Sequence, residues 1–408
     1  MIILRNVILE KCGLTDVLND FIENESRGLK RNNMLVYLDS SATTPMKSEV
    51  IEEMNRVMEK VYGNPSSVYS LGALAKEEIE NARKKVAKVI GAKKEEIYFT
   101  SSGSEADNLA IIGIARANKS KGNHIITTKI EHKAVLNSCK KLEKEGFEIT
   151  YLNVDENGRI NFSELMNAIN ERTILISVMA INNEIGTIQD LEQIGKIAKY
   201  KGVIFHSDSV QAIGHLNINV KSINIDSLSI SAHKFNGPKG VGAVYIKENV
   251  KFEPIIYGGH QERGKRAGTE NIAGIVGLAK AIELATENIT EKNMKVSKIR
   301  DYLKQKLLEL DKRVKINCDS VYKSSSNLSV CFENINGKDM VLMLDMKGIC
   351  VSTGSACNSS ESSASHVLLA TGISEHDAKN TIRFSLSENN TIEEMDYVIE
   401  CIKEILNK

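Results

Sequence analysis

The sequence predicts an α/β protein in which a large domain with a mostly parallel sheet is followed by a smaller α+β domain. Apolar segments of strand length alternate with helical patterns up to about residue 271, which is typical of a parallel sheet covered by helices. Beyond that point the pattern changes to long helices followed by short strands. The length of 408 residues fits two or three domains, because one domain usually has roughly 100–200 residues.

The N-terminal part of the chain is predicted to lead from an extension into two helices. Residues 1–36 precede the first strong motif, and we expect them to form an N-terminal extension with one short helix. Residues 37–45 (YLDSSATTP) indicate a short strand followed by turn residues. Apolar residues then recur at helical spacing, which predicts helices at 48–62 and 73–90.

The predicted large domain, residues 46–288, contains seven strands. Short apolar runs predict these strands at 96–101, 124–128, 148–152, 173–180, 203–207, 226–231 and 241–246. Helical patterns lie between most of them, at 104–117, 133–145, 163–171 and 190–200. The last two strands have no helix between them, so we expect an antiparallel strand there.

The predicted small domain combines residues 37–45 with residues 289–408. Long helices are predicted at 271–288 and 291–310, and the second of these opens the domain. Short strands and one final helix follow, at 327–332, 348–352, 380–386 and 391–407. The serine-rich run at 359–365 is more typical of a loop than of a packed element.

Composition argues against several classes of protein. Lys plus Arg and Asp plus Glu both total 53, so the net charge of zero argues against a general nucleic-acid binder. No apolar run approaches the ~20 residues of a membrane span, and the first residues lack signal-peptide features. The 7 scattered cysteines form no C-x-x-C pair, which disfavours a zinc ribbon and a disulfide framework. We therefore expect no membrane or direct nucleic-acid partner, and a reducing, cytoplasmic location.

Polar motifs follow several predicted strands, where open parallel sheets bind their ligands. In FTSSGSEADN, Gly103 and Ser104 lie between a strand and a helix, where backbone N–H groups and a hydroxyl can bind phosphate. The same residues would also suit an ordinary helix N-cap. In FHSDSVQ, Asp208 follows an apolar strand and could either pair with a protonated ring nitrogen or cap a helix.

Three further residues are candidates for chemistry. Lys234, in SAHKFNGPKG, follows a strand and suits a Schiff-base nucleophile, although most lysines are simply solvated. Such a lysine, an acid and a phosphate site together are what pyridoxal phosphate needs. Cys357, in the Gly/Ser-rich STGSACNSS, is either a reactive thiol or an incidental loop cysteine. Arg383, in TIRFSLS, could bind a carboxylate or face solvent on an edge strand.

In this order, the motifs resemble those of cysteine desulfurases of the NifS/IscS type, which are class V aminotransferase-like, fold-type-I pyridoxal phosphate enzymes. The resemblance covers about residues 36–408 and rests on YLDSSATTP, GNPSS, FTSSGSEADNLAI, EHKAVL, NNEIGT, HSDSVQ, SAHKFNGPKG, ERGKRAGTEN, GSAC and IRFSL. It implies a homodimeric enzyme that removes sulfur from L-cysteine with pyridoxal 5'-phosphate. It also implies a protein that accepts the sulfur, and an iron–sulfur cluster scaffold is the acceptor that we expect.

The resemblance implies a role for each matching residue. Lys234 is the Schiff-base lysine, Asp208 keeps the pyridinium nitrogen protonated, and His132 stacks on the ring and exchanges protons. Cys357 attacks the substrate sulfur and keeps it as a persulfide while L-alanine is released. No resident metal is implied, although Cys357 could help to hold a transient cluster. Gln211 binds the ring hydroxyl, and Asn183 and Arg383 bind the substrate carboxylate. The phosphate is bound by Gly103, Ser104, Ser231, His233 and, from the other subunit, Thr269.

Three alternatives stay open at this point. A selenocysteine lyase or another class V aminotransferase-like lyase would share the cofactor site, although Cys357 in GSAC favours persulfide chemistry. A non-catalytic sulfur carrier or assembly scaffold is disfavoured because every inferred catalytic position is filled. A metal protein is disfavoured because no Cys/His spacing matches a ligand signature.

Overall fold

The computed structural model describes residues 34–354 and 364–407. The chain divides into two compact units, Met1–Leu35 and Val36–Lys408, and the helices and strands of the described residues lie in the second. The N-terminal extension predicted at 1–36 therefore lies almost wholly outside the described residues. None of the described helices combines the length and the apolar character needed to cross a membrane.

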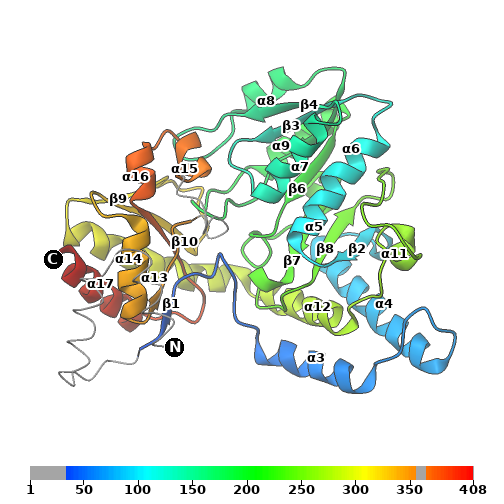
Figure 1. The fold of residues 1–408 in the computed structure, drawn as a ribbon, viewed down its shortest axis with the longest axis horizontal. Coiled ribbons are helices and arrows are strands. Elements are labelled where there is room, and N and C mark those ends of the chain that lie inside the picture. Colours follow the sequence, from blue (N-terminus) through cyan, green and yellow to red (C-terminus); the bar gives the residue numbers. More distant parts are fainter. Residues whose placement is uncertain (1–33, 355–363, 408) are drawn as a thin grey trace. The chain divides into compact units, whose positions relative to one another are not determined.

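A seven-stranded sheet in the described part of the chain has the order β2-β8-β7-β6-β5-β3-β4 (Figure 1). Its strands are β2 (Ile97–Thr100), β3 (His124–Thr128), β4 (Glu148–Leu152), β5 (Thr173–Ser177), β6 (Ile204–Asp208), β7 (Ser227–Ser231) and β8 (Gly242–Ile246). Only β8 among these is reversed, because it runs antiparallel to both β2 and β7. The seven predicted strands and the predicted antiparallel strand are confirmed, with differences at the strand ends.

Helices cover both faces of this sheet, which is the arrangement that a parallel sheet requires. One face packs against the helical segment made by α5 (Gly103–Asn108), a π-helical turn (Leu109–Gly113) and α6 (Ile114–Ala117), and against α7 (Lys133–Glu143). The other face packs against α4 (Ser70–Ile90), α8 (Phe162–Ala168), α9 (Leu191–Lys201) and α12 (Ile272–Thr286), with α3 (Ser48–Lys60) outside α4 and α12.

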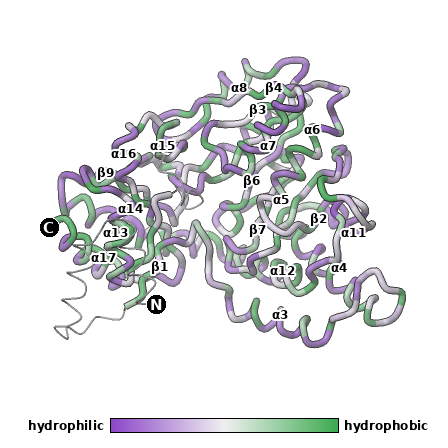
Figure 2. The backbone as a smooth tube through the Cα atoms, in the orientation of Figure 1, coloured by the Kyte–Doolittle hydropathy of each residue, from purple (hydrophilic) through white to green (hydrophobic). Residues whose placement is uncertain are grey.

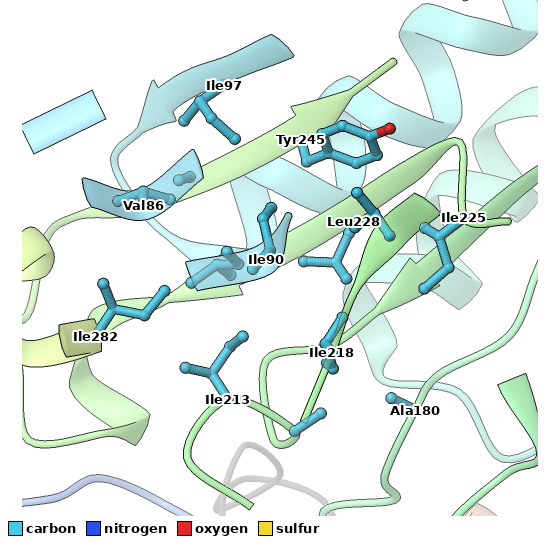
Figure 3. Close-up of a cluster of buried hydrophobic side chains, with 14 of the residues drawn as sticks. Val86, Ile90, Ile97, Ala180, Ile213, Ile218, Ile225, Leu228, Tyr245 and Ile282 are labelled. Atoms are coloured by element: carbon cyan, nitrogen blue, oxygen red, sulfur yellow. The ribbon is translucent and has the colours of Figure 1, made fainter. Parts of the chain in front are cut away.

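Alternate residues of a strand supply the two hydrophobic cores. In β8, Ala243 and Tyr245 belong to one core, whereas Val244 belongs to the core on the opposite face. Figure 3 shows Ile90 of α4 and Ile282 of α12 within the first cluster, together with Tyr245. Strands β3, β5, β7 and β8 are buried along their whole length, and each carries two or more of the aliphatic residues by which the sequence predicts it.

The C-terminal part has a hydrophobic core of its own. An antiparallel sheet of β12 (Thr381–Ser385), β10 (Asn327–Phe332) and β9 (Val314–Ile316) packs against α13 (Ile289–Leu310), α14 (Gly337–Met346) and α17 (Ile392–Leu406). Hydrophilic and hydrophobic residues alternate along α17, as a helix with one packed face requires (Figure 2). The strand β1 (Val36–Tyr37) pairs with β11 (Ile349–Cys350), so the start of this unit joins the same core. The division at 288/289 stays a prediction that the separate cores support.

The elements that the sequence does not predict are mostly short. They are β9, α10 (Val220–Ile223), α11 (Gln261–Gly264), α14, α15 (His366–Ala370) and α16 (Glu375–Lys379). The longest of them, α14, starts within Ile-Asn-Gly, which is typical of a turn. Here the side chain of Asn336 accepts a hydrogen bond from the backbone of Lys338 and thereby begins a helix.

A buried ion pair joins α4 to the segment that follows β8. Arg83 donates to both carboxylate oxygens of Glu262, at 2.7 and 2.8 Å, and the backbone of Phe99 donates to the same carboxylate. Glu262 and Arg263 have positive φ angles of 45° and 58°, a conformation that costs energy for residues other than glycine. The ion pair therefore holds a strained turn in place. Past that turn, Arg266 forms an ion pair with Glu105 in α5.

We predict that Arg83→Met lowers the free energy of unfolding by about 3–5 kcal/mol, because Glu262 is left buried without its cation. Adding Glu262→Gln should restore much of this loss. Urea denaturation of the single and double variants measures both changes. Arg56→Met is the matched control, since its partially exposed pairs with Glu53 and Glu78 should be worth at most about 1 kcal/mol. Equal losses in Arg83→Met and Arg56→Met would contradict the account.

Candidate active site

The predicted site residues gather at the carboxyl edge of the central sheet. Asp208 ends β6, Ser231 ends β7, and Lys234 closes the 3-10 turn that follows β7. His132 begins α7 a few residues after β3, and Asn183 follows β5. Since these parallel strands end at the same edge, residues that are far apart in the sequence meet there.

Lys234 lies against the segment that follows β1. Its Nζ atom donates to the carbonyl oxygens of Ser41 at 2.7 Å and Ala42 at 2.8 Å. The amide of Gln211 donates to the same Ser41 carbonyl at 2.9 Å, so Gln211 lies beside the lysine. These contacts place the Nζ atom of Lys234 beside Ser41, Ala42 and Gln211.

Asp208 is a buried acid in need of a cationic partner. Burial raises the pKa of its carboxyl, whereas His132, the backbone N–H of Val210 and Lys234 each lower that pKa. The N–H of Val210 donates to Oδ1 at 3.0 Å. A buried carboxylate is stable only when it is paired. A protonated ring nitrogen placed against Asp208 would supply that partner, which fits the predicted role.

The start of α5 is the candidate phosphate cradle. A Cβ atom on Gly103 would lie 2.8 Å from Val210 and 3.1 Å from the Cβ of Ser231, so only glycine lets the helix start this close to β7. Ser102 caps the helix by accepting from the N–H of Glu105, and Ser104 is exposed beside Gly103. These residues therefore bring backbone N–H groups and hydroxyls to one place, as an anion site requires.

The other two predicted phosphate ligands differ in their surroundings. Burial lowers the pKa of His233 to about 4, so this ring is neutral and can offer a hydrogen bond but no charge. Its Nδ1 atom meets the hydroxyl of Thr43 at 3.2 Å. Thr269 is exposed in the segment that Arg266 and Glu105 hold beside α5.

Arg383 is buried, so the alternative that it is a solvent-facing charge on an edge strand is wrong. Its side chain is 2% exposed and is paired with Asp39. Its Nη1 atom donates to the carbonyl of Asn183 at 2.9 Å and to that of Gly354 at 3.3 Å. Within the described ranges its Nε atom has no hydrogen-bond partner. A buried N–H without an acceptor is costly, so a substrate carboxylate would complete this site.

Glu184 lies close to Gly354 and Ser365, which stand on either side of the segment 355–363. A Cβ atom on Gly354 would lie 3.1 Å from the Oε2 atom of Glu184. The hydroxyl of Ser365 donates to the same Oε2 and also accepts from the backbone at the start of α15. Cys357, the predicted nucleophile, belongs to the segment between these anchors and lies outside the described residues.

The sequence prediction omits three acids that the structure brings to the site: Asp39, Asp107 and Glu131. Asp39 lies two residues past β1 and Asp208 ends β6, so the place of Asp39 near a strand end could have indicated it. Glu131 is completely buried and accepts from the hydroxyl of Thr128 and the backbone of Met179. Burial raises the pKa of Glu131 to about 8, so at neutral pH this carboxyl is protonated.

The chain is similar to known proteins over nearly its whole length. The family model described as "Aminotransferase class-V" matches residues 36–398. A cysteine desulfurase IscS of Methanosarcina thermophila is 52% identical over 384 residues, which cover 94% of this chain and 95% of that protein. A cysteine desulfurase IscS of Clostridium botulinum is 53% identical over 378 residues, covering 92% of this chain and 95% of that protein.

Solved structures agree with these relatives. A NifS-like protein aligns with a TM-score of 0.86 and 41% identity, and the alignment covers 92% of this chain and 100% of that one. A structure of SspA in complex with cysteine aligns with a TM-score of 0.76 and 37% identity, covering 87% of this chain and 100% of that one.

We predict that Glu131→Gln stabilises the protein increasingly as the pH rises. In the fold the pKa of Glu131 is raised from 4.5 to about 8. The protonated carboxyl therefore makes its full contribution to the free energy of unfolding below about pH 4.5, and this contribution is lost as the pH rises toward 8. Glutamine needs no proton, and at pH 7 the variant should gain on the order of 3 kcal/mol in free energy of unfolding. Urea denaturation at several pH values measures the difference, and a difference that does not change with pH would contradict the assignment.

Proposed function

The chain belongs to the class-V aminotransferase family and is a cysteine desulfurase that uses pyridoxal 5'-phosphate, and we propose that Cys357 is its sulfur-accepting nucleophile. One observation carries the proposal: Arg383, the candidate carboxylate ligand, binds the carbonyl of Gly354, which precedes Cys357 by three residues. Three residues of extended chain span at most about 11 Å. The chain therefore links Cys357 through three residues to a carbonyl bound by Arg383, the group that would hold the substrate.

The described residues fit the cofactor. When bound, pyridoxal phosphate supplies a carbonyl that takes up an amine and a protonated ring that stabilises negative charge on the substrate α-carbon. We propose that Lys234 holds it covalently, that Asp208 pairs with its ring nitrogen and that Gln211 binds its ring hydroxyl. The close approach that Gly103 allows supports a phosphate site at the start of α5, and this site would be completed by Ser104, Ser231 and His233.

Arg383 and Asn183 are the proposed ligands of the substrate carboxylate. The unpartnered Nε atom of Arg383 supports this role, because a carboxylate can satisfy the N–H groups on one side of a guanidinium together. The pair with Asp39 and the carbonyl of Asn183 fix the other nitrogens of the side chain. L-cysteine would thus be oriented by its carboxylate, with its sulfur free to face Cys357.

Proton transfer is assigned to Lys234 and His132. The Nδ1 atom of His132 accepts from the backbone N–H of Ala134 at 3.1 Å, so the ring proton sits on Nε2. That proton is available to the substrate or to the group that leaves it. We propose that Nζ of Lys234, once neutral, holds the proton taken from the substrate α-carbon.

The sulfur transfer itself balances without an added oxidant. The thiolate of Cys357 attacks the substrate sulfur, so an S–S bond forms while the bond between that sulfur and Cβ breaks. The electron pair of the broken bond goes to the carbon fragment, which gains a proton there and is released as L-alanine. Cys357 keeps the transferred sulfur as a persulfide until an acceptor collects it.

Partners and location complete the proposal. We propose a homodimer in which Thr269 of one subunit binds the phosphate in the other, and the exposure of Thr269 supports this arrangement. The proposed sulfur acceptor is an iron–sulfur cluster scaffold, which the naming of the relatives as IscS supports. A reducing, cytoplasmic setting suits the chemistry, and the cysteines among the described residues are free thiols.

We predict that the protein, loaded with cofactor and given L-cysteine and a reductant, forms L-alanine and sulfide in equal amounts. Lys234→Ala and Cys357→Ala should each lower alanine formation by about a thousandfold or more, because each removes a group that forms a covalent bond in the reaction. Cys401→Ala, which changes a buried cysteine of the C-terminal core, is the matched control and should stay active. Sulfide with pyruvate and ammonia, and no alanine, would contradict the role of Cys357.

A further inference from the structure

Asp107 is a buried acid beside the cofactor residues that the proposed function does not use. It lies in α5 and is 1% exposed. One side-chain polar atom of each of Asp107, His132 and Asp208 lies within 4.8 Å of the other two. Its Oδ1 atom has no hydrogen-bond partner in the described part of the chain.

His206 lies beside Asp107 but offers it no positive charge. The Nε2 atom of His206 is 3.8 Å from Oδ1 of Asp107, but burial lowers the pKa of His206 to about 3. Hydroxyls of Ser177 and Ser229 meet its two ring nitrogens at 2.9 and 3.0 Å. The ring of His206 is therefore neutral. The Nδ1 atom of His132 accepts a backbone hydrogen bond, and this ring acts on Asp208, whose pKa it lowers.

The remaining titratable groups also favour a neutral Asp107. Burial raises the pKa of Asp107 well above its usual value, Asp208 and Glu131 raise it further, and only a hydrogen bond with Ser229 opposes the rise. Lys234 directs its ammonium to the carbonyls of Ser41 and Ala42 and acts on Asp208. Two carboxyls this close together in a buried site do not both ionise.

Building on the proposed cofactor site, we propose that Asp107 is a positioning residue that stays a neutral carboxylic acid and so leaves one negative charge, on Asp208, to meet the protonated ring nitrogen. The charge of Asp208 then matches the single charge of the ring. Asp107 acts through Asp208 and His132 and touches neither the substrate nor the cofactor in this account.

Infrared spectroscopy of the full-length protein loaded with pyridoxal phosphate tests the protonation directly. At pH 7 we expect bands of protonated carboxylic acids, one of which shifts when aspartate is labelled with carbon-13 and disappears in Asp107→Asn. Glu131→Gln is the matched control, because it should remove a different band, one that aspartate labelling does not shift. A wild-type spectrum in which aspartate labelling shifts no such band would overturn the proposal without any variant.

Cofactor binding supplies a second readout. Replacing a neutral acid by a neutral amide should change the Kd for pyridoxal phosphate at pH 7 by at most about tenfold, the worth of one hydrogen bond. Asp208→Asn removes the charge itself and should weaken binding by much more. A loss in Asp107→Asn as large as that in Asp208→Asn would mean that Asp107 is charged, and would overturn the proposal. Both readouts are independent of alanine formation, so failure of the proposed function would be seen separately.

Discussion

The common direction of the strands is the constraint on which the site depends. In the described part of the chain, every strand of the central sheet except β8 has its carboxyl end at the same edge. This brings together residues from distant parts of the sequence: Asp208 at the end of β6, Lys234 after β7, His132 after β3 and Asn183 after β5. The reversed strand β8 ends elsewhere and supplies none of the proposed site residues.

Burial of charged groups makes this edge ready for ligands. Arg383 has Asp39 and two carbonyls as partners, and its Nε atom has none among the described residues. Asp208 is an acid whose natural partner is a cation. Burial raises the pKa of both Glu131 and Asp107, in the case of Glu131 to about 8. A ligand with a cationic ring and a substrate with a carboxylate would supply partners for Asp208 and Arg383.

The sequence predicts the central sheet and the main cofactor residues because both have strong local signals. Buried strands carry short clusters of aliphatic and aromatic residues, and Asp208 and Lys234 lie at the end of one such strand and three residues past another. The sequence does not predict the strand β9 because it has only 3 residues. It does not predict the helix α14 because the first residues of that helix are typical of a turn. The depth of Arg383 and the closeness of Asp107 to Asp208 depend on how distant segments pack. No periodicity in one sequence encodes that packing. The position of Cys357 lies outside the described residues.

The most direct test of the account is to locate the covalent bond between protein and cofactor. The protein loaded with pyridoxal phosphate is reduced with borohydride, digested, and mapped by peptide mass spectrometry. The account predicts the reduced cofactor on Nζ of Lys234, because this is the lysine at the sheet edge beside Asp208 and Gln211. The cofactor on a different lysine, or on none, would contradict the central claim that the carboxyl edge of the sheet is the active site.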